Sequence, residues 1–363
     1  MIWTRRLAGT RRPSLVIGGD GALEHLTPRA AAAAAAGSRF FVVTDHNVKA
    51  AWGGVLLELL DPAGRPEDML SVLPGEASKS VENLAACWDW LAAQGARRND
   101  VVVALGGGVV GDLAGFAAST YLRGISLWQI PTSLVAQVDS SVGGKTGVDL
   151  VAGKNLVGSF YQPDLVIVDP ATLTTLPDEE YVGGLGEVVK YGLLHSEELF
   201  STLEDNTEPV MTRDRQLLGT LVQRCVEYKA DVVEEDELDQ DRRAVLNLGH
   251  TTAHALERSL GYGVLSHGRA VALGLLVSLR LSEELLGLGP EAQVRARRLL
   301  SALGLPVGVT LPPVESLLTA ASRDKKITAG GSGFVGLAAI GAPVWGMDVP
   351  ATLFTRALEA IRA

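Results

Sequence analysis

Cysteine is scarce in this chain: only Cys87 and Cys225 occur among its 363 residues. Two cysteines cannot build a disulfide framework, so we expect two buried thiols in a reducing compartment. Long hydrophobic runs are missing as well, because no stretch of about 18 apolar residues is free of both charge and glycine. No apolar run follows the arginine-rich N-terminal segment MIWTRRLAGTRRPS, as one would in a secretory signal. These absences predict a cytoplasmic protein without a membrane span.

An excess of positive charge is also missing. The formal net charge is −10, which argues against a nucleic acid or an anionic membrane surface as a partner. A local cluster of Lys and Arg could still bind an anionic small molecule. Hydrophobic residues make up 47% of the chain and charged residues 20%, so the chain has enough apolar surface to fold. Its length suits two domains.

The hydrophobic pattern of the first half predicts a parallel sheet. Short β-branched runs alternate there with helical stretches such as 82–94, and the runs lie at 40–44, 101–105, 125–130 and 165–169. Strands that alternate with helices are typical of βαβ units. Because these strands are continuously apolar, we expect helices on both faces of the sheet.

The pattern changes near residue 177. Helical periods follow at 180–194, 214–234, 247–260, 268–284 and 292–303, with one further strand expected at 334–340. We therefore predict an α/β domain over residues 1–177 and a mainly α-helical domain over residues 178–363.

Three segments of the first half could bind an anionic or polyhydroxylated ligand. ALGGGVVGD (104–112) joins a strand to a helix, where glycines and a helix N-terminus suit a pyrophosphate, although a plain tight turn would look the same. GEASKS (75–80) places a Glu and a Lys three residues apart, a spacing that exposed surface charges also show. The segment 137–154 sets Asp139, Lys145 and Lys154 among small residues, which fits phosphate binding or a flexible surface loop.

Histidines gather in the second half. His250 and His254 lie four residues apart on a predicted helix, and His267 precedes another helix. With a carboxylate, such imidazoles could form a catalytic metal site with N and O ligands; which of the three would bind the ion is left open, as is a purely structural role. Glu187 and Lys190 stand among four glycines, which suggests that something packs closely on their helix. Cationic and amide side chains precede the histidines, suited to a phosphate or carboxylate; they are Lys229, Arg242, Arg243 and Asn247.

Taken in this order, the motifs resemble the 3-dehydroquinate synthase family. The most specific segments are GGGVVGDLAGFAASTYLRG, IPTSLVAQVDSSVGGKTGVDLVAGKNLVGSFYQP, and LNLGHTTAHALE followed by HG. The resemblance runs from about residue 42 to residue 340. It implies an N-terminal Rossmann-like NAD-binding domain, a C-terminal α-helical metal-binding domain, and a homodimer.

The resemblance also implies roles for individual residues. The zinc ligands would be Glu187, His250 and His267, with Co²⁺ as an alternative ion. NAD would contact Asp45, Gly75, Glu76, Lys79, Gly108, Val109, Val110, Gly111, Asp112, Thr132, Ser133, Lys145, Lys154, Thr172, Leu173, Thr174 and Thr175. Catalytic residues would be Lys145, His254, Asp139, Asn155, Lys190, Lys229, Arg243 and Asn247, and further substrate contacts would come from Arg123, Lys325 and Lys326.

The activity implied is conversion of 3-deoxy-D-arabino-heptulosonate 7-phosphate to 3-dehydroquinate and phosphate. NAD would be reduced and reoxidised in each turnover, with β-elimination of phosphate between and intramolecular aldol closure after. Three departures from the family pattern stand at Ser133, Asp239 and Arg269. The alternatives are a cyclase that makes an inosose or a valiolone, a metal-dependent polyol dehydrogenase, and a non-catalytic homologue.

Overall fold

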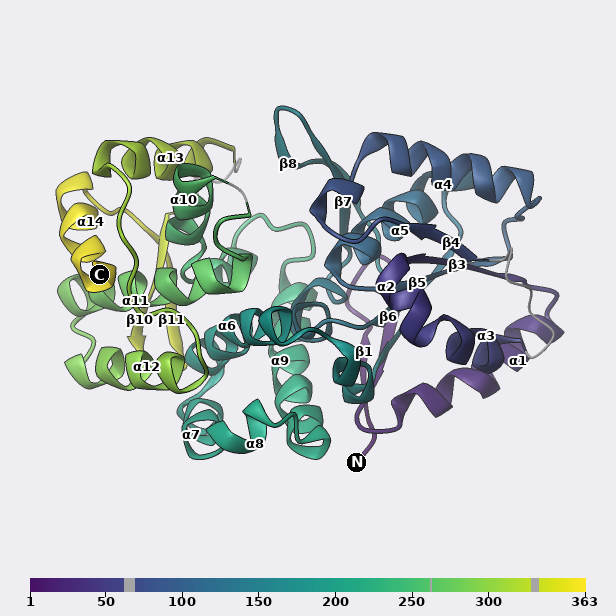
Figure 1. Cartoon of the computed structure of the whole chain (residues 1–363), viewed down its shortest axis with the longest axis horizontal. Helices are drawn as coiled ribbons and strands as arrows, with labels where there is room; N and C mark the ends of the chain where they lie inside the picture. Colours follow the sequence, from purple (N-terminus) through teal and green to yellow (C-terminus); the bar gives the residue numbers. More distant parts are fainter. Residues whose placement is uncertain (62–68, 262, 328–332) are drawn as a thin grey trace. The chain divides into compact units, whose positions relative to one another are not determined.

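The structure is a computed structural model that describes residues 1–61, 69–261, 263–327 and 333–363. The chain divides into two compact units (Figure 1). The first comprises Met1–Pro177 and Arg215–Glu237, and the second comprises Asp178–Asp214 and Leu238–Ala363. The domains expected from the sequence, 1–177 and 178–363, differ from these units by one segment: Arg215–Glu237 groups with the first unit.

The first unit contains a seven-stranded sheet with the order β1-β2-β9-β6-β5-β3-β4. All neighbouring pairs are parallel except β1 with β2, which is antiparallel at the edge. The strands are β1 Trp3–Leu7, β2 Ser14–Gly18, β3 Phe40–Asp45, β4 Met69–Val72, β5 Val101–Gly106, β6 Ser126–Pro131 and β9 Leu165–Val168. The four strands expected from the sequence are therefore all present. The edge strands β1 and β4 were not predicted, and neither was β2, which lies next to β1.

Helices cover both faces of this sheet. Alternate residues of β3 point to opposite sides: Phe41 and Val43 pack in one core with α4 and α5, and Val42 packs in another with α1 and α3. Parallel strands buried on both faces read as continuous apolar runs, which explains the sequence pattern. The helices of this unit are α1 Leu26–Ala35, α2 His46–Val48, α3 Gly54–Leu60, α4 Val81–Ala93, α5 Gly108–Thr120 and α9 Arg215–Glu235. A hairpin of β7 Lys145–Leu150 and β8 Gly153–Phe160 follows a π-helical turn at Ala136–Ser140.

The second unit is mainly helical. Its helices are α6 Asp178–His195, α7 Glu197–Asp205, α8 Thr207–Met211, α10 His250–Leu260, α11 His267–Leu286, α12 Pro290–Ala302, α13 Val314–Ile327 and α14 Ala351–Ala357. The strand expected at 334–340 is β10 Phe334–Ala339, and it pairs with β11 Ala342–Met347 as an antiparallel hairpin. Most of α11 is buried, so this helix is the centre of the unit.

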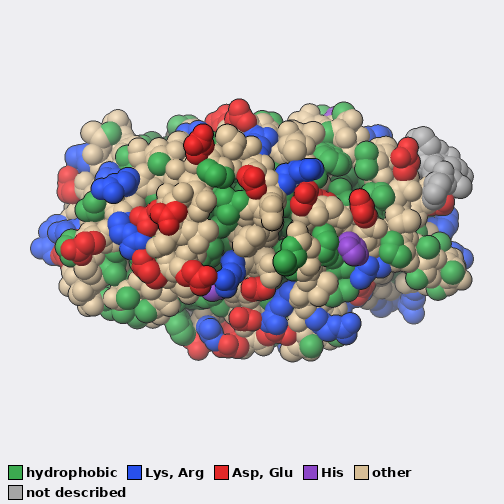
Figure 2. Space-filling model, turned by 90° about the horizontal axis from the view of Figure 1, so that it is seen from below, with side chains coloured by type: hydrophobic (Ala, Val, Ile, Leu, Met, Phe, Trp, Pro, Cys, Tyr) green, Lys and Arg blue, Asp and Glu red, His purple; other side chains and the backbone are tan. Residues whose placement is uncertain are grey.

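Acidic and basic side chains are interspersed on the face of the molecule drawn in Figure 2, with no broad field of one sign. In the described part of the chain, no helix combines the length and the apolarity needed to cross a membrane.

Candidate active site

The residues expected to bind a nucleotide follow the carboxyl ends of five parallel strands. Asp45 ends β3, Gly75 to Lys79 follow β4, Gly108 to Asp112 follow β5, Thr132 and Ser133 follow β6, and Thr172 to Thr175 follow β9. Because the strands are parallel, all these segments lie on the same side of the sheet, at the carboxyl ends of its strands. The chain reverses its direction of winding between β3 and β5, and ligands of open α/β sheets bind at such a reversal.

The glycine turn after β5 is tightly packed. A Cβ at Gly106 would lie 2.6 Å from Cβ of Val110, and one at Gly108 would lie 3.1 Å from the Ser140 hydroxyl oxygen. Helix α5 begins at Gly108, one residue after its N-cap Gly107, which has extended backbone and no side chain to cap the helix. The first N–H groups of α5 are therefore of the kind that binds a pyrophosphate.

An ion pair between the buried Lys79 and the half-buried Asp112 lies beside this turn. Nζ of Lys79 is 2.5 Å from Oδ2 of Asp112 and also donates to the side-chain oxygen of Asn155. Burial raises the pKa of Asp112, and the ammonium group of Lys79 only partly offsets that rise. Nζ of Lys154, the residue before Asn155, lies 3.6 Å from Oε1 of Glu76. A hollow of about 340 Å³ opens here, lined by Glu76, Lys79 and the N-terminus of α4 among others.

The loops after β6 and β9 are joined by buried hydrogen bonds. The Gln137 amide donates to the Thr172 hydroxyl at 2.9 Å and to the Asp169 carbonyl at 2.9 Å. The exposed Thr175 hydroxyl accepts from the Trp52 indole at 2.7 Å. Asp45 caps α2 by accepting from two backbone N–H groups. These contacts fix the positions of the loops at the carboxyl ends of the strands.

Asp139 and Lys229 are brought together within the first unit. The Lys229 ammonium donates to the Asp139 carbonyl at 2.8 Å and forms an ion pair with its carboxylate. Lys145 is exposed at the start of β7, which packs on α5. Arg123 lies elsewhere, in a left-handed turn (φ 68°) at the far end of α5. The 13 residues of α5 separate it from the glycine turn by roughly 20 Å.

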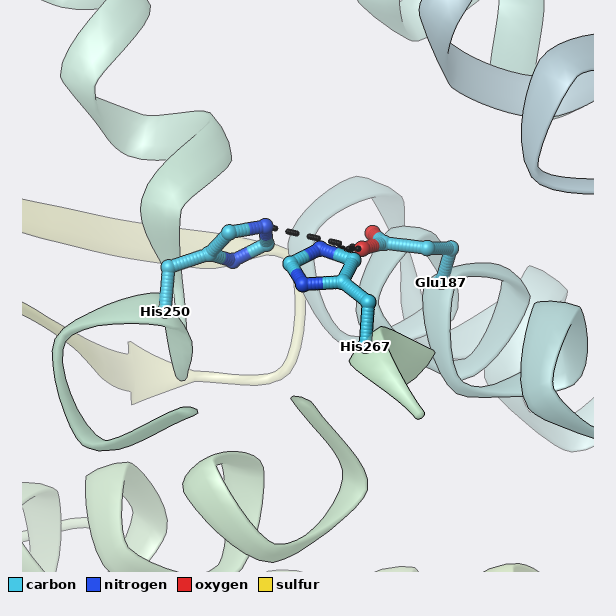
Figure 3. Close-up of side chains that lie close together, drawn as sticks. All are labelled: Glu187, His250 and His267. Carbon is cyan, nitrogen blue, oxygen red and sulfur yellow. Dashed lines mark ion pairs between the residues drawn. The ribbon is translucent and has the colours of Figure 1, made fainter. Parts of the chain in front are cut away.

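Three potential metal ligands converge in the second unit (Figure 3). Oε1 of Glu187 lies 3.5 Å from Nε2 of His250 and 3.3 Å from Nε2 of His267. The other ring nitrogen of each histidine faces an oxygen: His250 Nδ1 lies 3.2 Å from the Leu248 carbonyl, and His267 Nδ1 lies 3.5 Å from Oε1 of Glu257. Both imidazoles thus present Nε2 to one point, as metal-binding histidines do. Two histidines and a carboxylate fit a divalent ion such as Zn²⁺ with a position left open for a substrate.

Close contacts between glycines place these ligands. A Cβ at Gly268 would lie 1.8 Å from the Gly183 carbonyl oxygen, so only glycine lets the start of α11 cross α6 there. This contact sets His267 beside Glu187. At the other ligand, a Cβ at Gly274 would lie 2.0 Å from the Gly249 carbonyl oxygen, which fixes the start of α10 at His250. The glycines around Glu187 therefore do accommodate a closely packed element, as the sequence suggested.

The electrostatics of the cluster suit a cation. Glu187 is 1% exposed; burial raises its pKa, but Lys190 and His250 outweigh this and hold the pKa well below its usual range. Burial lowers the pKa of His250. Burial also acts to lower the pKa of His267, yet Glu187 and Glu257 raise it to about 10. The carboxylate is thus ionised at neutral pH.

The other expected residues of this unit lie near or beyond the cluster. The His254 ring centre is 5.7 Å from that of His250 and 6.0 Å from that of His267. Lys190 is 1% exposed, with Nζ 2.6 Å from Oε2 of Glu187. Arg243 (buried) and Asn247 (half-buried) lie in the short helix Arg242–Asn247, which leads toward α10. Lys325 and Lys326 lie near the end of α13, and their side chains are outside the part of the chain that the structure describes.

Sequence reasoning missed Glu257, whose carboxylate faces His267. The signal was available: Glu257 follows His250 and His254 on one helix at a spacing that places all three on the same face. The contact with Leu248 could not be read in this way, because a backbone carbonyl has no sequence signature.

Two family models match consecutive parts of this chain. The N-terminal model of 3-dehydroquinate synthase matches residues 69–183, and the C-terminal model matches residues 184–327. The chain belongs to the 3-dehydroquinate synthase family. It is 46% identical over 350 residues to a 3-dehydroquinate synthase of Caulobacter vibrioides, with 94% of both chains covered. It is 47% identical over 309 residues to that of Salinibacter ruber, covering 84% of this chain and 83% of the other.

Solved structures share the fold of this family member. A 2-deoxy-scyllo-inosose synthase, complexed with carbaglucose-6-phosphate, NAD⁺ and Co²⁺, superposes with a TM-score of 0.85 at 24% identity, covering 99% of this chain and 100% of the other. A 2-epi-5-epi-valiolone synthase of Streptomyces hygroscopicus, with NAD⁺ and Zn²⁺ bound, has a TM-score of 0.80 at 27% identity, with 89% and 90% covered. The α/β and helical architecture expected from the sequence is thereby confirmed.

Proposed function

We propose that this chain is a 3-dehydroquinate synthase, which converts 3-deoxy-D-arabino-heptulosonate 7-phosphate to 3-dehydroquinate and inorganic phosphate. One observation carries the proposal: Glu187, His250 and His267 converge in a chain that is 46% identical to such an enzyme over nearly its whole length. The reaction serves the shikimate pathway and aromatic amino acid biosynthesis. The solved cyclases at 24% and 27% identity are more distant, so their substrates are weaker candidates.

Residues 1–177, together with α9, would form the NAD-binding domain. The N–H groups at the start of α5 would bind the pyrophosphate, and Asp45 lies at the winding reversal, where an acidic side chain can bind a ribose hydroxyl. Lys79 would hold Asp112 and Asn155 in place through the contacts described above. The remaining contacts proposed for NAD are Gly75, Glu76, Gly108, Val109, Val110, Gly111, Thr132, Ser133, Lys145, Lys154, Thr172, Leu173, Thr174 and Thr175.

The second unit would bind a divalent cation through Glu187, His250 and His267. The chemistry that bound NAD supplies is hydride removal and return, and a bound Zn²⁺ or Co²⁺ polarises a substrate oxygen. Lys190 keeps Glu187 ionised in its buried position, because its ammonium group lies 2.6 Å from the carboxylate. His254, beside both ligand histidines, is the group proposed to accept and return a proton.

Cationic side chains would bind the anionic groups of the sugar phosphate. Arg243 is buried, and a buried guanidinium can bind a carboxylate or phosphate with two parallel hydrogen bonds. Lys229 is oriented by Asp139, which leaves its ammonium group in one place. The further substrate contacts proposed are Lys145, Asn155, Asn247, Arg123, Lys325 and Lys326. We also propose that the chain acts as a homodimer in the cytoplasm, which light scattering of the purified protein and fractionation of cells would test.

The deciding experiment measures phosphate release from 3-deoxy-D-arabino-heptulosonate 7-phosphate with catalytic NAD⁺ and added Zn²⁺, while absorbance reports NADH. We expect one phosphate per 3-dehydroquinate and no accumulation of NADH. NADH that builds up with the substrate would instead indicate a polyol dehydrogenase. Phosphate release only from another sugar phosphate would indicate an inosose or valiolone cyclase, and no reaction with any of these would favour a non-catalytic homologue.

Two variants link this activity to the proposed site. His250→Ala should lose both bound metal and turnover, because it removes a ligand. Lys145→Ala should keep the fold and lose most turnover, while Arg362→Ala, which removes a half-exposed cation paired with Glu359, should change neither. Wild-type kinetics in Lys145→Ala would remove Lys145 from the site.

A further inference from the structure

Glu257 is a buried carboxylate that the proposed chemistry does not use. It lies in the last turns of α10 and is 8% exposed. Its Oε1 is 3.5 Å from Nδ1 of His267, on the side of the ring opposite to Glu187. Burying a carboxylate costs free energy unless the group is paired, and the imidazole of His267 is one partner of Glu257. The question is what this pairing does for His267.

The effect of Glu257 on His267 depends on which of the two imidazole nitrogens carries the proton. A neutral imidazole carries one proton, and the nitrogen without it has the lone pair that binds a metal ion. An oxygen acceptor at Nδ1 holds the proton there and leaves the lone pair on Nε2. In His267 that acceptor is a carboxylate, whereas in His250 it is the neutral Leu248 carbonyl. His267 is thus the ligand with the more strongly polarised ring.

We propose that Glu257 is a positioning residue for the metal, which fixes His267 in the tautomer that presents Nε2 and increases the affinity of the site for a divalent cation. This inference rests on the metal site of the proposed function. It assigns to Glu257 no contact with the substrate or with NAD.

A second arrangement must be distinguished. His254, Glu257 and His267 also bring one potential ligand atom each within 4.8 Å of one another. A cation held there would use Nδ1 of His267 and would make Glu257 a ligand itself. The two arrangements differ in the number of ions bound and in the ring nitrogen that faces the ion.

The test is the affinity of the apoprotein for Zn²⁺, measured by competition with a chromophoric chelator. Glu257→Gln keeps the shape of the side chain and removes its charge, and we expect it to weaken Zn²⁺ binding by about 10- to 100-fold. Glu257→Asp should recover part of the loss. NAD affinity should stay near wild type, and circular dichroism should show that the apoprotein keeps its fold. The control is Glu283→Gln on α11, which removes a similarly buried carboxylate paired with Arg280 at 2.7 Å.

Nitrogen-15 NMR of histidine in the wild-type protein tests the same inference without a variant. In the Zn²⁺-loaded protein we expect one ion per chain, bound through Nε2 of His267, with the single proton of that ring on Nδ1. Unchanged Zn²⁺ affinity in Glu257→Gln would overturn the inference, and so would two ions per chain or coordination through Nδ1. A wild-type chain that binds no Zn²⁺ would overturn the metal site and the role of Glu257 with it. Failure of phosphate release in a chain that binds Zn²⁺ as described would leave Glu257 in place and refute only the proposed reaction.

Discussion

Gly268→Ala is the substitution whose effect the structure predicts most directly. The start of α11 crosses α6 so closely that a Cβ at residue 268 would lie 1.8 Å from the Gly183 carbonyl oxygen. The obstacle is backbone, which cannot rotate away as a side chain can. The metal ligand His267 is the adjacent residue, so any shift that relieves the clash also moves His267 relative to Glu187.

The size of that shift can be worked out. Real Cβ atoms essentially never approach such an atom within 3.0 Å, so the helices must separate by roughly 1.2 Å to admit the methyl group. A metal site tolerates deviations of only about 0.2 Å in its ligand distances. A displacement of about 1 Å in a catalytic constellation costs on the order of 100-fold in rate. Overpacking itself should destabilise the apoprotein by about 1–3 kcal/mol.

The assay compares Zn²⁺ affinity, phosphate release and thermal unfolding in three proteins. Gly268→Ala should lose Zn²⁺ affinity and turnover together. Gly183→Ala is the matched control at the same crossing, since its Cβ would lie 3.4 Å from the Ser266 hydroxyl, an ordinary contact. It should keep both properties and could gain up to about 1 kcal/mol of helix stability. Wild-type metal affinity in Gly268→Ala would refute the argument that this contact places the ligand.

Three further predictions follow from other parts of the structure. Removing divalent ions with a chelator should abolish turnover but leave the fold by circular dichroism, because Glu187 stays paired with Lys190 at 2.6 Å; Zn²⁺ or Co²⁺ should restore activity, and irreversible unfolding would contradict this. Lys79→Met should weaken NAD binding, measured by calorimetry, and destabilise the protein by about 1–3 kcal/mol, since it leaves the half-buried Asp112 carboxylate without its cation; unaltered NAD affinity would separate this pair from the nucleotide site. Burial acts to raise the pKa of Asp100, but hydrogen bonds from two backbone N–H groups outweigh burial, and the net pKa is lowered. The ionised Asp100 carboxylate therefore stabilises the fold fully above about pH 4, and this stabilisation is lost as the pH falls through the folded-state pKa. Asp100→Asn should therefore cost about 1–3 kcal/mol in urea unfolding at neutral pH and reduce the loss of stability in acid; an unchanged acid dependence would count against it.

The sequence predicted the central strands better than the edges. The runs at 40–44 and 101–105 became β3 and β5 because both faces of these strands are covered, which requires continuous apolar residues. The strand β1 has only five residues, WTRRL, and its three central residues are polar or charged, so it gave no strand signal. The segment 137–154 was open to a loop interpretation, yet part of it pairs as β7 and β8 because α5 supplies a packing surface.

The sequence by itself determined which chemical groups the protein has: the glycines at a strand end, the three histidines close together, and a glutamate in a helix rich in glycine. Local patterns of this kind are legible because they depend on neighbours along the chain. Residue spacing left open which of the histidines meet Glu187; the family resemblance implied His250 and His267, and the tertiary structure brings these two to it. Only the tertiary structure decided that Glu257 faces His267 and that α9 belongs with the first unit. Those outcomes depend on helix crossings at Gly183 and Gly268 and at Gly249 and Gly274, where the backbones of elements distant in the sequence come into contact.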